Sequence, residues 1–175
     1  MPDVDISELV RRYGPMVFRR ARYLLGNDAE AQDAVQEVFV RLVNKIDSFR
    51  AESQPSTWLY RITTNYCLNL IRDRGRRREL LEQHATSTED DPDPGAPDPE
   101  LMALMRRLLA AADPLQAQAA IYVHVDGMSH AEAAALLNVS RRTVGNLLER
   151  FEKWARRNLE GLVPNNAAGG SNYTK

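Results

Sequence analysis

The fold is constrained most strongly by residues 128–157, MSHAEAAALLNVSRRTVGNLLERFEKWARR. Ser129, with Glu132 three residues later, forms a capping-box pattern, which predicts the start of a short helix of alanines and leucines. Asn138 stands where this helix must end, because asparagine tolerates the left-handed backbone of a tight turn. Ser140 can then cap a second helix, which begins with two arginines and a threonine. Two short helices joined in this way predict a helix-turn-helix.

The second of these helices has a polar and basic outer face near its start. Apolar residues fall at spacings that bury the inner faces of both helices, and they are Ala134, Leu137, Val139, Val144 and Leu147. The outward positions are Arg141, Arg142, Thr143, Asn146 and Arg150. A helix-turn-helix places such positions at the major groove of DNA. The alternative is an ordinary helical hairpin with a solvated basic face, but the small first helix and the turn residues favour DNA binding.

Charge is unevenly distributed along the chain. The 175 residues carry a net charge of −1, but residues 1–84 hold 14 basic and 12 acidic side chains. Residues 101–160 hold 8 basic and 6 acidic side chains, whereas residues 85–100 hold 6 acidic and no basic ones. Residues 85–99 are rich in Pro, Asp, Ser and Thr and lack large aliphatic side chains, so we expect a disordered acidic linker there.

These patterns predict an all-α protein of two small helical domains joined by a flexible acidic linker. The first domain spans residues 1–84, the second, with the helix-turn-helix, spans residues 100–163, and a loose tail covers residues 164–175. In the first domain, apolar residues recur at helical spacing in three stretches that begin near residues 6, 29 and 55. Gly14 and Pro15 interrupt the first stretch, where we expect a break or a kink.

Two of the predicted helices carry polar faces. On the helix at residues 29–45, the face away from the apolar stripe holds Asp33, Gln36, Glu37, Val40 and Arg41. Taken alone, such a face is usually just solvated. The helix that begins near residue 55 carries a polar stripe and then a run of arginines, which together comprise Arg61, Asn65, Asn69, Arg72, Arg74, Arg76, Arg77 and Arg78.

Trp58 and Tyr60 flank the start of this third helix. Aromatic rings beside a basic helix suit single-stranded nucleic acid, because bases stack on the rings while arginines hold the phosphates. The alternative is that both aromatics are core residues and the arginines form a solvated helix end. So much like charge in one short stretch favours phosphate contact for the arginines. For Trp58, both interpretations remain open.

Other classes of protein find little support. The single cysteine, Cys67, excludes an internal disulfide and a cysteine-rich metal site, and the three histidines are not spaced as metal ligands. Neither a glycine-rich phosphate loop nor a nucleophile elbow is present, so we expect no enzyme activity, no cofactor and no metal. Because no signal peptide or bilayer-length apolar run occurs, we expect no membrane insertion and a cytoplasmic location.

Several motifs resemble those of one family, the extracytoplasmic-function (ECF) sigma factors of bacterial RNA polymerase. Its region 2 is similar to DAVQEVFVRL (residues 33–42), DSFR (47–50), TWLYRITTN (57–65) and RDRGRR (72–77). Its region 4 is similar to DGMSHAEAAALLNVSRRTV (126–144). The first set of motifs is specific, whereas the second is a common helix-turn-helix pattern. Together they span most of the chain outside the linker and the tail.

The resemblance implies a sigma factor that binds core RNA polymerase through its clamp helices and flap, recognises promoters and melts the −10 element. An anti-sigma factor is the usual further partner. Carried over by position, the residues that contact the polymerase clamp are Asp33, Gln36, Glu37, Phe39 and Arg41. Those that open the −10 element, hold a flipped base or contact nearby phosphates are Phe49, Arg50, Ser56, Trp58, Arg61, Asn65, Arg72, Arg74, Arg76 and Arg77. Those that contact the −35 element are Ser140, Arg141, Arg142, Thr143, Asn146 and Arg150.

The second helix of the helix-turn-helix departs from the family pattern. Relatives usually carry basic residues where this chain has Gly145 and Leu147, and here the charges lie at Arg141 and Arg142 instead. The promoter sequence, the set of controlled genes and the inducing signal are therefore not fixed by the resemblance. Two other functions remain as alternatives. One is a self-sufficient helix-turn-helix regulator whose residues 1–84 serve dimerisation or sensing, and the other is an enzyme or adaptor.

Overall fold

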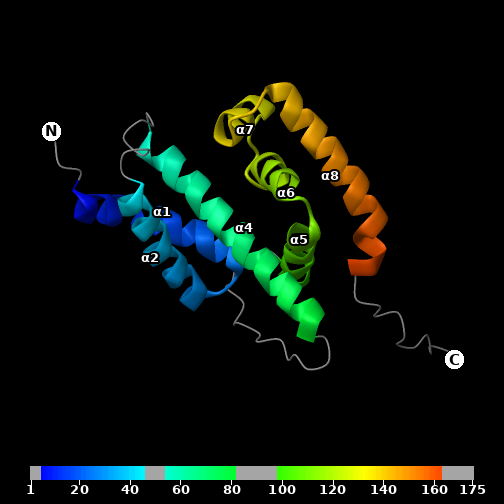
Figure 1. Ribbon diagram of the computed structural model, residues 1–175, viewed down its shortest axis with the longest axis horizontal. Helices are drawn as coiled ribbons and strands as arrows, with labels where there is room; N and C mark the ends of the chain where they lie inside the picture. Colours follow the sequence, from blue (N-terminus) through cyan, green and yellow to red (C-terminus); the bar gives the residue numbers. More distant parts are fainter. Residues whose placement is uncertain (1–4, 46–53, 82–97, 163–175) are drawn as a thin grey trace, which may run out of the picture.

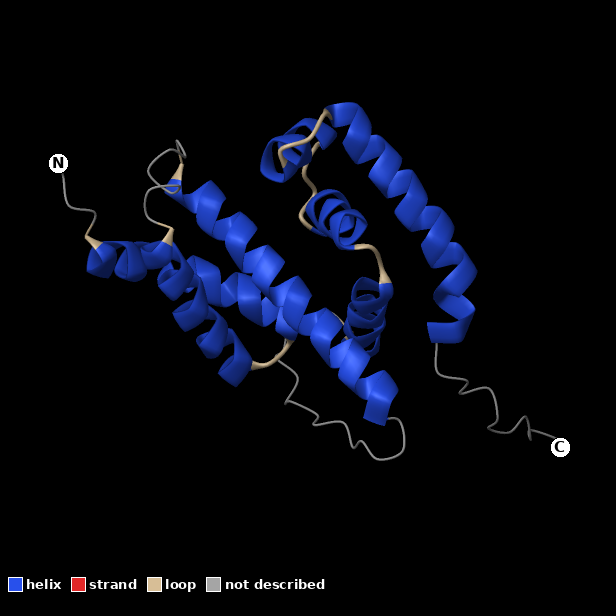
Figure 2. Ribbon diagram, viewed as in Figure 1, coloured by secondary structure: helices blue, strands red, loops and turns tan. Residues whose placement is uncertain are grey.

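The computed structural model describes residues 5–45, 54–81 and 98–162 (Figure 1). Every regular element within these ranges is helical (Figure 2), which confirms the all-α prediction. Phe49, Arg50 and most of the predicted linker and tail lie outside the described residues. The helices in chain order are α1 (Ile6–Leu25), α2 (Asp28–Asn44), α4 (Pro55–Leu81), α5 (Pro99–Ala111), α6 (Pro114–Ala120), the π-helical turn η1 (Ile121–Val125), α7 (His130–Leu137) and α8 (Arg141–Leu162).

Helix α1 continues through Gly14 and Pro15, so the chain does not break there, which was one of the two expected outcomes. A proline inside a helix removes one backbone hydrogen bond and costs about 3 kcal/mol. The ends of α1 are well fixed, since the Asp5 carboxylate accepts the N–H of Ser7 at 2.9 Å and Gly26 closes the helix with φ 75°. One face of its second half is buried, and these tertiary contacts outweigh the local defect.

Helices α1, α2 and α4 pack against one another as the first half of the molecule. One hydrophobic cluster between them comprises Val17, Val38, Phe39, Leu42, Trp58 and Leu59. Helices α5 to α8 form the second half, on the other side of α4 in Figure 1. Between α6 and α7 the chain widens into the π-helical turn, where the N–H of Asp126 bonds to the carbonyl of Ile121 at 2.9 Å.

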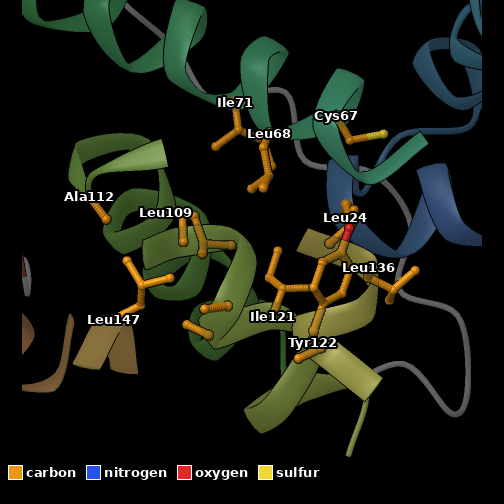
Figure 3. Packing of buried hydrophobic residues seen from close by; sticks show 14 of the residues in the cluster. Leu24, Cys67, Leu68, Ile71, Leu109, Ala112, Ile121, Tyr122, Leu136 and Leu147 are labelled. Atoms are coloured by element: carbon orange, nitrogen blue, oxygen red, sulfur yellow. The ribbon is translucent and has the colours of Figure 1, made fainter. Parts of the chain in front are cut away.

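The two halves share a second and larger hydrophobic core (Figure 3). The first half contributes Ala21, Leu24, Cys67, Leu68 and Ile71, and the second half contributes Leu109, Ala117, Ile121, Tyr122, Leu136, Val144 and Leu147. Leu24, Ile121 and Tyr122 are fully buried in it. In this structure the two helical blocks therefore pack together.

Cys67 lies in this shared core with no exposed surface. Burial raises the pKa of its thiol to about 12, although the charges of Arg20 and Arg74 oppose the shift. Among the described residues, no helix combines the length and the apolar content that crossing a bilayer requires.

We expect both halves to unfold in one transition, because they share a core. The two tryptophans lie one in each half, so Trp154→Phe and Trp58→Phe provide single-tryptophan reporters of the first and second half respectively. In urea titrations the two fluorescence midpoints should coincide. Leu24→Ala in either background should lower both urea midpoints together. The free energy of unfolding should fall by about 2–5 kcal/mol.

Val40→Ala is the matched control, because the Val40 side chain is 52% exposed and its loss leaves no cavity. Two separate transitions in the parent protein, or a Leu24→Ala effect confined to the first half, would contradict a shared core.

Candidate nucleic-acid interface

The helix-turn-helix forms through the residues that the sequence singled out. The N–H of Ser129 donates to the Glu132 carboxylate at 2.8 Å, and the N–H of Glu132 donates to the Ser129 hydroxyl at 3.2 Å. The first of these bonds holds the pKa of Glu132 below its ordinary value. Asn138 takes the predicted left-handed conformation, with φ 54°. The Ser140 hydroxyl then accepts the N–H of Thr143 at 3.0 Å and caps α8.

The outer face at the start of α8 is open to solvent. Its inner face buries Val144, Leu147 and Leu148 in the shared core. Ser140, Arg141, Arg142, Asn146 and Arg150 are all exposed, and Thr143 is half-buried. The structure thus brings the six predicted −35 residues together, with Ser140 at the cap of α8 and the other five within its first three turns. Arginines at the exposed end of a helix can contact phosphates and base edges in a major groove.

The polar stripe of α4 is partly covered. Asn69, Arg76 and Arg77 are exposed, whereas Ser56, Arg61, Asn65, Arg72 and Arg74 are half-buried. Arg74 forms an ion pair with Glu30 of α2, and Arg76 forms one with Asp73. The sequence placed these arginines together on one helix, and α4 does extend through the whole run.

Two side chains of this stripe have polar atoms that are buried without a hydrogen bond to the described part of the chain. They are Asn65, at its Oδ1 atom, and Arg72, at its Nε and one Nη atom. The other Nη of Arg72 donates to the Asn69 side chain at 2.8 Å. Burial lowers the pKa of Arg72 from its ordinary value, while the charge of Asp113 raises it. Unsatisfied polar groups destabilise a structure and need an explanation, such as an absent ligand.

Trp58 lies in the core of the first half and is only 2% exposed. Its ring packs in the cluster with Val38, Phe39 and Leu42 and offers no face to a base. The sequence left two interpretations of Trp58 open, base stacking and core packing. In this structure Trp58 is a core residue. The reason is helix phase, since Trp58 and the buried Leu59 start the face of α4 that rests on α1 and α2.

The outer face of α2 combines charges with exposed apolar side chains. Asp33 and Gln36 are exposed, and Arg41 Nε donates to Glu37 Oε1 at 2.8 Å. The guanidinium of Arg41 also lies 4.8 Å from the ring centroid of Tyr66 on α4. Phe39, assigned to this surface by resemblance, instead points into the core with 6% exposure.

One residue of this face was missed by the sequence reasoning. Val43 is 49% exposed and lies three residues beyond Val40, which is 52% exposed. Together the two valines place apolar area on the exposed face of α2. The sequence could have predicted this, because Val40 and Val43 are three residues apart and lie outside the buried stripe, so they share one face of the helix.

No group of histidine, cysteine or carboxylate side chains in the described ranges is arranged to hold a metal ion.

Gly145 lies at an open position of α8, where an added Cβ would meet no atom within 4 Å. We therefore expect Gly145→Ala to raise the free energy of unfolding by about 0.5–1 kcal/mol, since glycine is a poor helix former. Gly26→Ala is a contrasting variant, because Gly26 has φ 75° and its Cβ would meet Arg106. It should destabilise the protein in the same urea titration. A Gly145→Ala variant that loses stability would show that the site is not open.

Two family models match successive parts of the chain. A family model described as Sigma-70 region 2 matches residues 9–77, and one described as Sigma-70, region 4 matches residues 102–153. Among curated relatives, the ECF RNA polymerase sigma factor SigE of Mycolicibacterium smegmatis is 35% identical over 157 residues, which cover 86% of this chain and 59% of that protein. The ECF sigma factor SigW of Bacillus subtilis is 27% identical over 169 residues and 89% of each chain.

Two solved structures have the same fold. The sigma factor RpoE of Bartonella quintana, in complex with the anti-sigma factor NepR, matches with a TM-score of 0.53 at 22% identity, over 89% of this chain and 97% of that one. CnrH, in complex with the cytosolic domain of CnrY, matches with a TM-score of 0.52 at 23% identity, over 89% and 88% of the two chains. With both region models matched in order, the chain belongs to the sigma-70 family, as one of its extracytoplasmic-function members.

Proposed function

We propose that this chain is an alternative sigma factor, which binds core RNA polymerase and directs promoter recognition and −10 melting in transcription initiation. The observation that carries the proposal is the presence of sigma region 2 and region 4 in one chain, in that order. The relatives quoted above are named as RNA polymerase sigma factors. The chain spans 59% of the length of SigE, so the roles of individual residues are argued from this structure.

The α2 face is the proposed polymerase-binding surface. Asp33, Gln36, Glu37 and Arg41 supply charge and hydrogen bonds, and Val40 and Val43 supply apolar area at its centre. Interfaces of this kind gain affinity from apolar contacts and gain orientation from the surrounding charges. Phe39 supports this surface from beneath, because it is buried.

The polar stripe of α4 is the proposed −10 surface. A base flipped out of its stack costs a few kcal/mol, and hydrogen bonds within a pocket offset that cost. Asn65 suits this role because its Oδ1 atom is buried without a partner. Arg61, Arg72, Arg74, Arg76 and Arg77 hold the phosphates beside it. Phe49 and Arg50 lie outside the described residues and belong to the same proposed set. Trp58 acts as a support beneath the stripe, since it is part of the core.

The face of α8 from Ser140 to Arg150 is the proposed −35 surface. Its charges are concentrated in Arg141 and Arg142 at the exposed start of the helix. Because Gly145 leaves open space at the next turn, the backbone of α8 can approach DNA closely there.

The chain's role is that of an initiation subunit without an enzymatic reaction of its own, acting in the cytoplasm where transcription occurs. An anti-sigma factor is the expected regulatory partner. The matched structures of RpoE and CnrH were determined as complexes with NepR and with the cytosolic domain of CnrY.

The experiment that tests this function incubates the chain with core RNA polymerase and a library of promoter sequences, and selects for open complexes. Sequence-specific open complexes that require both proteins support a sigma factor. Specific duplex binding by the chain alone would point to a self-sufficient regulator. If the chain shows neither open-complex formation nor specific duplex binding, both the sigma-factor function and the regulator function are contradicted.

We expect Asn65→Ala to reduce open-complex formation at least tenfold, while binding to core polymerase and the free energy of unfolding change little. The variant removes a buried acceptor that has no partner, so the fold loses no hydrogen bond. Permanganate footprinting of unpaired thymines measures the melting. Trp58→Ala is the comparison, because it should lower the free energy of unfolding by about 3–5 kcal/mol and impair both activities. Equal loss of polymerase binding and melting in Asn65→Ala would assign Asn65 to the fold instead.

We expect Glu37→Arg to weaken binding to core polymerase at least tenfold, which is about 1.4 kcal/mol, through reversal of a charge at the α2 face. The Glu37–Arg41 pair is exposed, so stability should change by less than about 1 kcal/mol. Competition with a labelled wild-type chain measures the affinity. Glu152→Arg is the matched control, since it reverses an exposed charge on α8, away from α2. Equal weakening by both variants would exclude a specific role for α2.

A further inference from the structure

Three arginines in the described part of the chain lie against tyrosine rings, and they differ in what their donors contact. Arg20 of α1 lies 4.4 Å from the ring centroid of Tyr60, but it is buried, and both of its Nη atoms donate to Asp126, at 2.6 and 2.8 Å. The donors of Arg20 are therefore used inside the fold. The other two arginines keep part of their surface exposed.

One of these two, Arg41, joins α2 to α4 through Tyr66 (Figure 1). The guanidinium of Arg41 lies 4.8 Å from the ring centroid of Tyr66, and its Nε atom donates to Glu37 Oε1 at 2.8 Å, one helical turn earlier on α2. Neither contact uses the two Nη atoms of Arg41, and the side chain is 41% exposed. Arg41 is thus held at two points, and its Nη edge takes part in neither contact.

Tyr66 stands at the margin of the buried face of α4. It is half-buried, and it packs against both hydrophobic clusters, whereas Cys67 and Leu68, the next two residues, have no exposed surface. One part of Tyr66 therefore rests on the core, and its ring lies against the guanidinium of Arg41. A ring in this position is fixed by the fold and can fix a surface side chain in turn.

The charges of the α2 face also act on Tyr66. Burial raises the pKa of its hydroxyl above the ordinary value, the carboxylates of Glu37 and Asp33 raise this pKa further, and the charge of Arg41 opposes them. The ring is therefore neutral at physiological pH. Three residues of the proposed polymerase-binding surface, Asp33, Glu37 and Arg41, thus lie within electrostatic reach of one tyrosine on the neighbouring helix.

The ring supplies what the ion pair alone cannot. An exposed pair within a helix does little to fix two long side chains, because water screens the charges and each side chain loses rotamer freedom. A ring against the planar guanidinium adds a second contact and restricts its orientation. A partner that binds Arg41 then orders this side chain at a lower entropic cost, because the side chain is already held in the free chain.

We infer that Tyr66 is a positioning residue for polymerase binding, whose ring holds the Arg41 guanidinium against Glu37 so that the Nη edge of Arg41 is preset to meet a carboxylate of core polymerase. Tyr66 acts through Arg41 and does not itself contact the polymerase. The inference rests on the proposed function of the α2 face, and it adds a residue of α4 that the predicted polymerase-binding set lacks.

A double-mutant cycle on the affinity of the full chain for core polymerase tests this role, measured by competition with a labelled wild-type chain. Tyr66→Leu should weaken binding at least about fivefold, because it keeps apolar volume but removes the ring. Arg41→Gln should weaken binding at least as much. The double variant should be no weaker than Arg41→Gln alone, because residues that act through one another are not additive. Tyr66→Phe keeps the ring and should bind within about twofold of the parent protein.

Tyr13→Leu is the matched control. Tyr13 is also half-buried, packs against the hydrophobic cluster of the first half and lies against an arginine, Arg12, at 5.5 Å from its ring centroid, but both residues are on α1. The control variant loses a similar ring and a similar arginine contact. It should lower the urea midpoint about as much as Tyr66→Leu, yet its affinity for core polymerase should stay within about twofold of the parent protein.

Nuclear magnetic resonance of the free chain tests the geometry without polymerase. The Tyr66 ring should shift the Nε–H resonance of Arg41, and the bond to Glu37 should slow the exchange of this proton with water. Tyr66→Leu should remove the shift and speed the exchange at least about fivefold, whereas Tyr66→Phe and Tyr13→Leu should change neither. If circular dichroism shows that Tyr66→Leu does not fold, Tyr66→Met takes its place in both measurements, with the same expectations.

The outcomes separate this inference from the function on which it rests. If the parent chain binds core polymerase but the losses in Tyr66→Leu and Arg41→Gln add in the double variant, Tyr66 does not act through Arg41 and the inference is overturned. Parent-like affinity in Tyr66→Leu, or an Arg41 resonance that does not move in this variant, would overturn it as well. If the parent chain does not bind core polymerase, the proposed function is overturned, and the role of Tyr66 in binding is overturned with it.

Discussion

The guanidinium of Arg20 is removed from water where the two halves meet, and the surrounding structure is arranged to accommodate it. Asp126, Thr64 and Tyr60 together satisfy its charge and its donors, and they come from both sides of the junction. An apolar core of the same volume would often be equally stable or more so. We therefore assign this pair to orientation, since only one way of docking the halves brings Asp126 onto Arg20, and the apolar residues around Tyr122 supply the bulk of the binding energy.

Local patterns of the sequence predicted the elements well, because they depend on neighbours in the chain. The capping box at Ser129, the turn at Asn138 and the apolar stripes of α1 and α2 follow from spacing alone. The break considered at Pro15 does not occur, because tertiary contacts of α1 outweigh a local defect. Trp58 could not be assigned, since a ring at the start of a helix can lie on either face until its partners on α2 are known.

Contacts between distant segments could not be predicted from the sequence. Neither Arg20 nor Asp126 differs in its local surroundings from an exposed charge, so their pairing appears only when α1 and the end of the π-helical turn are brought together. The site residues were predicted as three groups on α2, α4 and α8. The structure gathers the described members of each group at one helix, but it also shows that the groups differ in exposure. The α8 face is open, whereas the α4 stripe is half-covered.

The position of Cys67 has a consequence for redox chemistry. The thiolate is the form that reacts with peroxides and disulfides, and a pKa of about 12 leaves about one thiol in 100,000 ionised at neutral pH. Full burial also bars oxidants from the sulfur while the halves stay together. The chain's only cysteine is therefore poorly suited to sense oxidative stress while the shared core stays intact.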